Sequence, residues 1–190
     1  MNCLENQPNP LLSGYLPLFE QIDIDKIGYK TIDAQIKTQT TEFKQFETSL
    51  NKDEYKFQEI FDHLEVLDYP LSRTYGIISH LSGVNDSKSI RDIKDHFRND
   101  IVELGKLSSH SKLLYDAIKK IETDDDNEKR VVKLTIEGME RGGVNLPEDQ
   151  KSRLTAIDKI LSEQSTKLSE NVLDATKAFK KTVTDKELMK

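Results

Sequence analysis

The chain has 190 residues, of which 33% are charged and 35% hydrophobic, and its formal net charge at pH 7 is −6. A chain of this length can bury a hydrophobic core, and its many charges favour amphipathic helices that bury one stripe and solvate the rest. The negative net charge argues against nucleic acid and anionic membrane surfaces as partners.

The N-terminal segment does not resemble a targeting signal. It lacks a basic start and an unbroken apolar run, and no later stretch reaches the ~20 apolar residues that span a bilayer. The single cysteine, Cys3, cannot form an internal disulfide and suits a reducing compartment. We therefore expect a cytoplasmic protein without a membrane partner.

Residues 1–23 are predicted to form an extended lead-in, because proline removes a backbone donor and fixes φ. The lead-in holds three of the five prolines: Pro8, Pro10 and Pro17. A first helix is predicted over 24–50, with Asp23 or Asp25 as its cap. Its apolar residues recur at helical spacing. They are Ile32, Ile36, Phe43 and Phe46.

Two helices are predicted in the middle of the chain. The second helix starts near Asp53 and is interrupted by Pro70, beyond which it continues to about residue 81 with a kink. A turn at Gly83 and Asn85 separates it from the third helix, over 87–107. The third helix has apolar residues three or four positions apart: Ile90, Ile93, Phe97, Ile101 and Leu104.

Three more helices are predicted over 109–121, 126–141 and 147–180. Gly142-Gly143 should stop the fifth helix, and Pro147 suits the first position of the sixth. No long strand-like alternation occurs, so the fold class is predicted to be all-α, an antiparallel bundle of about six helices. The sixth helix carries one apolar face: Leu154, Ile157, Leu161, Leu168, Val172, Ala175 and Phe179.

The acidic run Asp124-Asp125-Asp126 suggests a metal loop at first sight. A calcium loop needs a glycine at its sixth position, where this chain has Lys129. Carboxylates at the start of a helix complement its dipole. The run is therefore predicted to be a capped helix start.

No catalytic or metal-binding residue is predicted in this chain, and its substrate-binding residues remain unknown. The chain has no His-Glu-x-x-His, Gly-x-Ser-x-Gly or Gly-x-Gly-x-x-Gly string. The four histidines are isolated along the chain: His63, His80, His96 and His110. The tyrosines are candidates for a binding surface, although core packing is the simpler interpretation of most of them. They are Tyr15, Tyr29, Tyr55, Tyr69, Tyr75 and Tyr115.

Two stretches carry a resemblance to a known family. The first is Asn-Pro-Leu-Leu at 9–12 with Leu-Pro-Leu-Phe at 16–19. The second, more specific, is Gly-Gly-Val-Asn-Leu-Pro at 142–147 with Leu-Ser-Glu-Asn-Val-Leu-Asp-Ala-Thr-Lys-Ala-Phe at 168–179. With the helix spacing between them, they resemble the N-terminal region of the zinc oligopeptidases related to thimet oligopeptidase and neurolysin, especially the bacterial oligopeptidase A branch.

The resemblance implies an all-helical enzyme divided by a deep channel, in which zinc held by a His-Glu-x-x-His helix and a downstream glutamate hydrolyses short peptides. It implies that residues 24–183 form the helical N-terminal oligopeptidase domain, a wall of that channel, and that 184–190 are the truncated start of the following segment. Phe57 and Phe179 stand where relatives often have a larger aromatic residue.

The zinc motif is absent, so no ligand or catalytic role can be transferred to any residue here. We expect a fragment or short product that is inactive alone and holds no cofactor, while zinc belongs to the full-length family. Its expected partners are the C-terminal catalytic part, in cis or as a separate chain, and short peptides. The sixth helix should then expose an apolar stripe. The alternatives are a stand-alone helical module that binds peptides or proteins, and a hydrolase with ligands gathered from separate helices.

Overall fold

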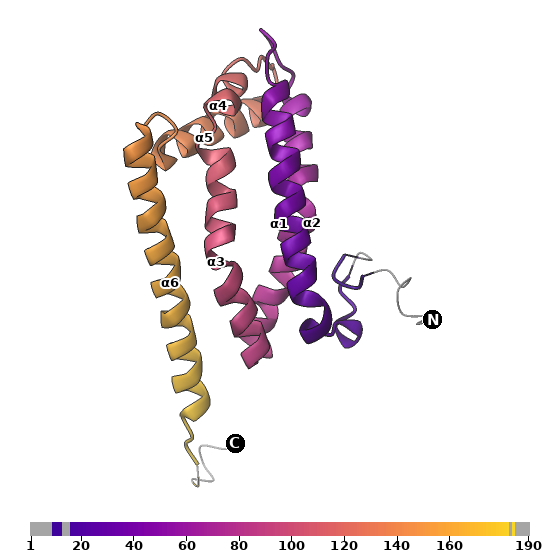
Figure 1. Ribbon diagram of the computed structural model, residues 1–190, viewed down its shortest axis with the longest axis vertical. Helices are drawn as coiled ribbons and strands as arrows, with labels where there is room; N and C mark the ends of the chain where they lie inside the picture. Colours follow the sequence, from indigo (N-terminus) through magenta and orange to yellow (C-terminus); the bar gives the residue numbers. More distant parts are fainter. Residues whose placement is uncertain (1–8, 13–15, 183, 185–190) are drawn as a thin grey trace.

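The structure, a computed structural model, describes residues 9–12, 16–182 and 184. The predictions for Cys3, Pro8, Tyr15 and most of 184–190 fall outside these residues. Within them the chain forms six α-helices and one 3-10 turn (Figure 1), which confirms the all-α class. The elements are η1 Phe19–Gln21, α1 Ile24–Ser49, α2 Phe57–Val84, α3 Lys88–Ser109, α4 Lys112–Ile118, α5 Asp126–Gly142 and α6 Glu148–Ala178.

The long helices stand side by side, and α4 and α5 lie across one end of them (Figure 1). Helices α1, α2 and α3 contact one another, and each runs antiparallel to the helix before it. Helix α6 contacts α3 and forms the outermost member of the row. None of the helices that the structure describes is both long and apolar enough to cross a membrane.

Two hydrophobic clusters form the core, and α6 contributes a buried residue to neither. One cluster joins α1, α2 and α3 through Ile32, Leu71, Ile78, Ile90, Ile93 and Phe97. The other joins the opposite ends of α1 and α2 to α4 and α5, with Phe43, Ile60, Ile118 and Met139 among its members. One core therefore lies between α1, α2 and α3, and the other lies at the end of the bundle that α4 and α5 cover. Helix α6 lies outside both cores.

Helix α2 differs from its prediction at both ends. It begins at Phe57 rather than near Asp53, because Tyr55 is extended, donates its N–H to Lys120 O at 3.4 Å and forms an isolated bridge with Ile121. It then continues past the exposed Pro70 and through Gly83 to Val84, so the predicted turn begins only at Asn85.

Other helix boundaries differ from their predictions by a few residues. Helix α4 is shorter than the predicted 109–121, because α3 extends to Ser109 and Ile121 belongs to the bridge. Asp23, rather than Asp25, caps α1 by accepting from Lys26 N. Pro147 has extended backbone (ψ 155°) and precedes α6 as its N-cap instead of occupying its first turn.

Candidate functional site

The four histidines occupy separate structural positions. His63 stacks on Phe46 with ring centroids 4.1 Å apart, and His80 lies 5.9 Å from Phe19. The other two also have local partners. The ring of His96 contacts Tyr29 and Phe97, each at 4.6 Å, and His110 Nε2 lies 2.8 Å from Gly142 O. Each imidazole is therefore engaged in packing or in holding a helix end.

The acidic run before α5 caps that helix, as predicted. Asp125 Oδ1 accepts from the backbone N–H groups of Asn127 and Glu128, at 2.8 and 3.0 Å. Lys129 Nζ donates to Asp126 Oδ1 at 3.1 Å. Among the described residues, no group of three or more histidine, cysteine, aspartate or glutamate side chains could hold a metal ion. The described residues therefore provide no ligand set for the zinc that the resemblance implies for the full-length family.

The turn into α6 follows the predicted glycine stop. Helix α5 ends at Gly142, and Gly143 has a left-handed φ of 97°. A Cβ at Gly143 would come within 2.8 Å of Leu146 Cδ1 and 3.0 Å of Leu154 Cδ2. Glycine is needed here both for its φ and for this close approach, which packs the turn against the start of α6.

The side of α6 that meets α3 is mainly polar. Its half-buried positions include Thr155, Asp158, Ser162 and Thr166. Lys106 of α3 pairs with Asp158 at 2.5 Å, and Lys159 of α6 pairs with Glu103 at 2.5 Å. Hydrophobic burial contributes little to this contact, so charge pairs hold α6 in place.

Arg91 attaches the far end of α6. Its guanidinium donates to both oxygens of Asp174 at 2.6 and 3.0 Å, and to Asp86 in the α2–α3 connection at 2.7 Å. Lys177 Nζ adds a bond to Asp86 Oδ2 at 3.2 Å. Hydrogen bonds from Arg91 hold the pKa values of both Asp86 and Asp174 below the usual range, and they raise the pKa of Arg91.

The opposite side of α6 carries an exposed apolar stripe, as expected from the family resemblance. The α6 stripe consists of Ile157, Ile160, Leu161, Leu168, Val172 and Phe179. Leu168, near its middle, is 65% exposed. Leu154 is only partly exposed and marks the end at which the helix enters the turn.

Ile160 is the one member of the α6 stripe that the sequence pattern did not include. It lies three residues after Ile157 and one before Leu161, so it widens the apolar face. A surface of this kind, along roughly 30 Å of helix, is unusual for a monomer, and large exposed apolar patches are typical of interaction sites.

The tyrosines do not gather on one surface. Tyr55 and Tyr115 are buried, and burial raises the pKa of the partly buried Tyr75. Tyr29 and Tyr69 are exposed on different helices, α1 and α2. Core packing therefore accounts for Tyr55 and Tyr115, and no common binding surface includes all the described tyrosines.

Comparison with known proteins gives consistent similarities. A sequence model described as the neurolysin/thimet oligopeptidase N-terminal domain matches residues 32–151. A probable cytosolic oligopeptidase A from Arabidopsis thaliana is 31% identical over 188 residues, covering 94% of this chain and 26% of the relative.

Two further relatives carry related names. The organellar oligopeptidase A (chloroplastic/mitochondrial) of Arabidopsis thaliana is 29% identical over 94% of this chain and 23% of its own length. Oligopeptidase A of Escherichia coli is 28% identical over 69% of this chain and 20% of its own length. The chain thus spans about a quarter or less of the length of these curated relatives.

Proposed function

This chain belongs to the neurolysin/thimet oligopeptidase family through its N-terminal domain, and we propose that it forms one wall of a peptide channel in a zinc-dependent oligopeptidase. The observation that carries the proposal is the α6 stripe, which lies outside both hydrophobic cores. In this proposal, a cytoplasmic enzyme hydrolyses short peptides and the chain shapes the space in which they bind.

The partner on the α6 stripe is the catalytic part of the same enzyme, in cis or as a separate chain. The relatives have about three-quarters or more of their length outside the region similar to this chain, which is ample to cover the stripe. Burial of apolar surface stabilises by roughly 25 cal/mol per Å², so covering six large side chains would provide a strong attachment.

Zinc and the hydrolytic step belong to that catalytic part. The described histidines are used in packing and capping, so no metal ligand, base or nucleophile is assigned to this chain. The residues of this chain have a structural role. The ion pairs with α3 orient α6, and α6 then presents its apolar stripe to the catalytic part.

A complementation assay tests this proposal. The chain is mixed with the part of the Arabidopsis cytosolic relative that remains after its similar region is removed, and cleavage of a short peptide is followed. We expect the chain alone to cleave nothing and the mixture to show cleavage that a chelator abolishes. Chelator-sensitive cleavage by the pure chain, or a mixture no more active than its parts, would contradict the proposal.

A matched pair of leucines tests the role of the α6 stripe. Leu168→Lys places a charge in the middle of the stripe, and we expect it to abolish complementation because a buried unpaired charge is strongly unfavourable. Leu113→Lys makes the same change at a 50% exposed leucine on α4 and should leave activity intact. Both variants should retain the stability of the isolated chain within ~0.5 kcal/mol.

The stripe also suits the alternative function, a stand-alone module that binds a partner helix. Three results together would favour that alternative. The chain would bind an amphipathic helix saturably, Leu168→Lys would abolish that binding, and complementation would fail.

A further inference from the structure

The apolar side of α6 is nearly symmetric in its spacing. Apolar residues there lie in pairs at equal distances from the point between residues 164 and 165. The pairs are Leu161 with Leu168, Ile157 with Val172, and Leu154 with Ala175. Of the α6 stripe, only Ile160 and Phe179 have no apolar counterpart in this pattern. A face with the same spacing in both directions is complementary to a second copy of itself turned end for end.

The spacing suits the packing of one helix against another. Within each half of the pattern, successive apolar residues are three and four positions apart, as in the seam between two helices of a coiled coil. A two-fold axis perpendicular to the middle of α6 would place Leu161 of each copy opposite Leu168 of the other. Two leucine pairs would then flank the axis, and the other apolar pairs would continue the seam on both sides.

The middle of this side of α6 is polar. Gln164 and Ser165 are exposed, and neither side chain forms a hydrogen bond with another part of the chain that the structure describes. At the two-fold axis, Gln164 of each copy would lie beside Ser165 of the other, where the amide and the hydroxyl can both donate and accept. A polar pair within a helix seam fixes its register, because a shifted pairing would bury polar groups without partners.

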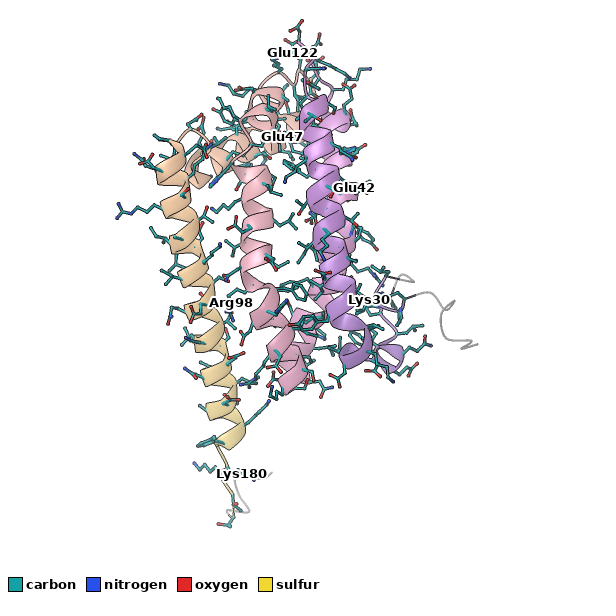
Figure 2. The ribbon with its side chains drawn as sticks, in the orientation of Figure 1. Lys30, Glu42, Glu47, Arg98, Glu122 and Lys180 are labelled. Carbon is teal, nitrogen blue, oxygen red and sulfur yellow. The ribbon has the colours of Figure 1, made fainter. Side chains whose placement is uncertain are left out.

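The charges at the two ends of α6 favour the antiparallel direction. The first turn contains Glu148 and Asp149, and Lys180 and Lys181 follow the last turn. Figure 2 shows Lys180 beyond the end of α6 that is farther from α5. The symmetric pairing brings Asp149 level with Lys180 of the second copy, and Glu148 level with Lys181. A parallel pair would instead place like charges together, which is unfavourable.

The area of this contact is near the lower limit for a specific interface. Helix α6 is the outermost helix, so the side away from α3 is open to a second copy (Figure 1). The side chains of the α6 stripe are 43–72% exposed. Six apolar side chains with on the order of 100 Å² each provide roughly 600 Å² per copy and 1,200 Å² for the pair, where specific interfaces begin. We therefore expect association at tens to hundreds of micromolar chain.

We propose that the free chain forms an antiparallel, two-fold symmetric dimer in which the α6 stripes of two copies pack against each other. The dimer needs no catalytic part, although it uses the surface that the proposed function gives to that part. One consequence rests on the proposed function: the dimer separates before the catalytic part binds. Dimer formation then protects the apolar surface of chains that have not yet assembled.

The test is sedimentation equilibrium of the full chain from ~1 µM to ~1 mM, a range that spans the expected Kd. We expect the mass to rise from 21.8 kDa towards twice that value. Leu168→Lys should keep the monomer mass throughout, whereas Leu113→Lys, at an exposed leucine of α4, should associate as the unchanged chain does. A constant monomer mass of the unchanged chain, or equal association of the two variants, would overturn the proposal.

Mixing two variants tests the antiparallel direction. Leu161→Glu and Leu168→Lys should each abolish association, because each leaves a charge opposite a leucine. In their mixture, the new carboxylate of one copy would face the new ammonium of the other, so we expect association at least about fivefold tighter than for either variant alone. In a parallel pair, positions 161 and 168 face their own equivalents. A mixture that associates no better than its components would therefore overturn the antiparallel arrangement.

Self-association and complementation can fail separately. A chain that forms the dimer but does not complement the catalytic part would remove the channel-wall proposal and leave the dimer. A chain that complements but stays monomeric over the whole concentration range would remove the dimer alone.

Discussion

At the residue scale, Arg91 joins three parts of the chain that are distant in sequence. It is only 26% exposed, and its planar guanidinium donates two bonds to Asp174 of α6 and further bonds to Asp86 between α2 and α3. Arginine suits this position because its fixed fork of donors can serve two carboxylates at once, which a lysine ammonium does less well. Arg91 thus connects the end of α6 to α3 and to the α2–α3 connection.

The pKa of Asp174 reports this contact. The hydrogen bonds from Arg91 lower it from 3.8, so the contact stabilises the fold above that ordinary pKa and is lost as the pH falls through the lowered one. We expect Arg91→Gln to raise the pKa of Asp174 towards 3.8, measured by NMR titration. The pKa of Glu163, lowered mainly by Lys167, serves as the control and should not change; an unchanged Asp174 would contradict the assignment.

Gly143 provides a second prediction at this scale. We expect Gly143→Ala to destabilise the chain by about 1–2 kcal/mol, because alanine is strained at positive φ and its Cβ would press on Leu146 and Leu154. Gly138→Ala, within α5 and with nothing near its Cβ, should stabilise by about 0.5–1 kcal/mol. Urea unfolding of both variants gives the comparison, and equal shifts would contradict the role of Gly143.

At the element scale, α6 differs from the other long helices. Helix α3 buries Ile90, Ile93 and Phe97, whereas α6 turns mainly polar and charged residues towards α3 and leaves most of its large apolar residues exposed. Arg98 of α3 lies in the region between the two helices (Figure 2). A helix attached mainly by partly exposed charge pairs is held weakly, which agrees with the proposal that another part of the enzyme packs on α6.

Salt should therefore loosen α6 more than α2. We expect hydrogen–deuterium exchange of α6 amides to speed up when ionic strength is raised to about 0.5 M, because salt weakens partly exposed ion pairs. The amides of α2, held through the buried Leu71 and Ile78, should exchange at an unchanged rate. A uniform response of both helices would show that α6 is held by something other than these charges.

At the scale of the whole molecule, the periodicity of apolar residues predicted the helices but not what each apolar face packs against. The three-four spacing of Ile90, Ile93 and Phe97 predicted a buried face, and the same pattern at Leu161 and Leu168 belongs to a face in water. The exposed stripe was expected only from the family resemblance. Early helical positions from Asp53 were wrong because the pairing of Tyr55 with Ile121 is a long-range contact that local patterns do not encode.

The packing around the lead-in was also beyond the sequence pattern. The lead-in folds back on α1, where Asn9 Nδ2 donates to Thr31 Oγ1. Spacing along α1 places Gln35 and Gln39 on one face, but only the tertiary structure shows that their amides donate to Pro70 O and Asp68 Oδ1 of α2.

The central claim is that this chain works as part of a zinc oligopeptidase. The most direct measurement is to precipitate it from the cells that make it, with an antibody against residues 122–137, a segment that does not include the α6 stripe, and to assay the precipitate for peptidase activity and zinc. We predict chelator-sensitive cleavage of short peptides and bound zinc in the precipitate, with neither in the purified chain. A precipitate without activity or zinc would contradict the claim.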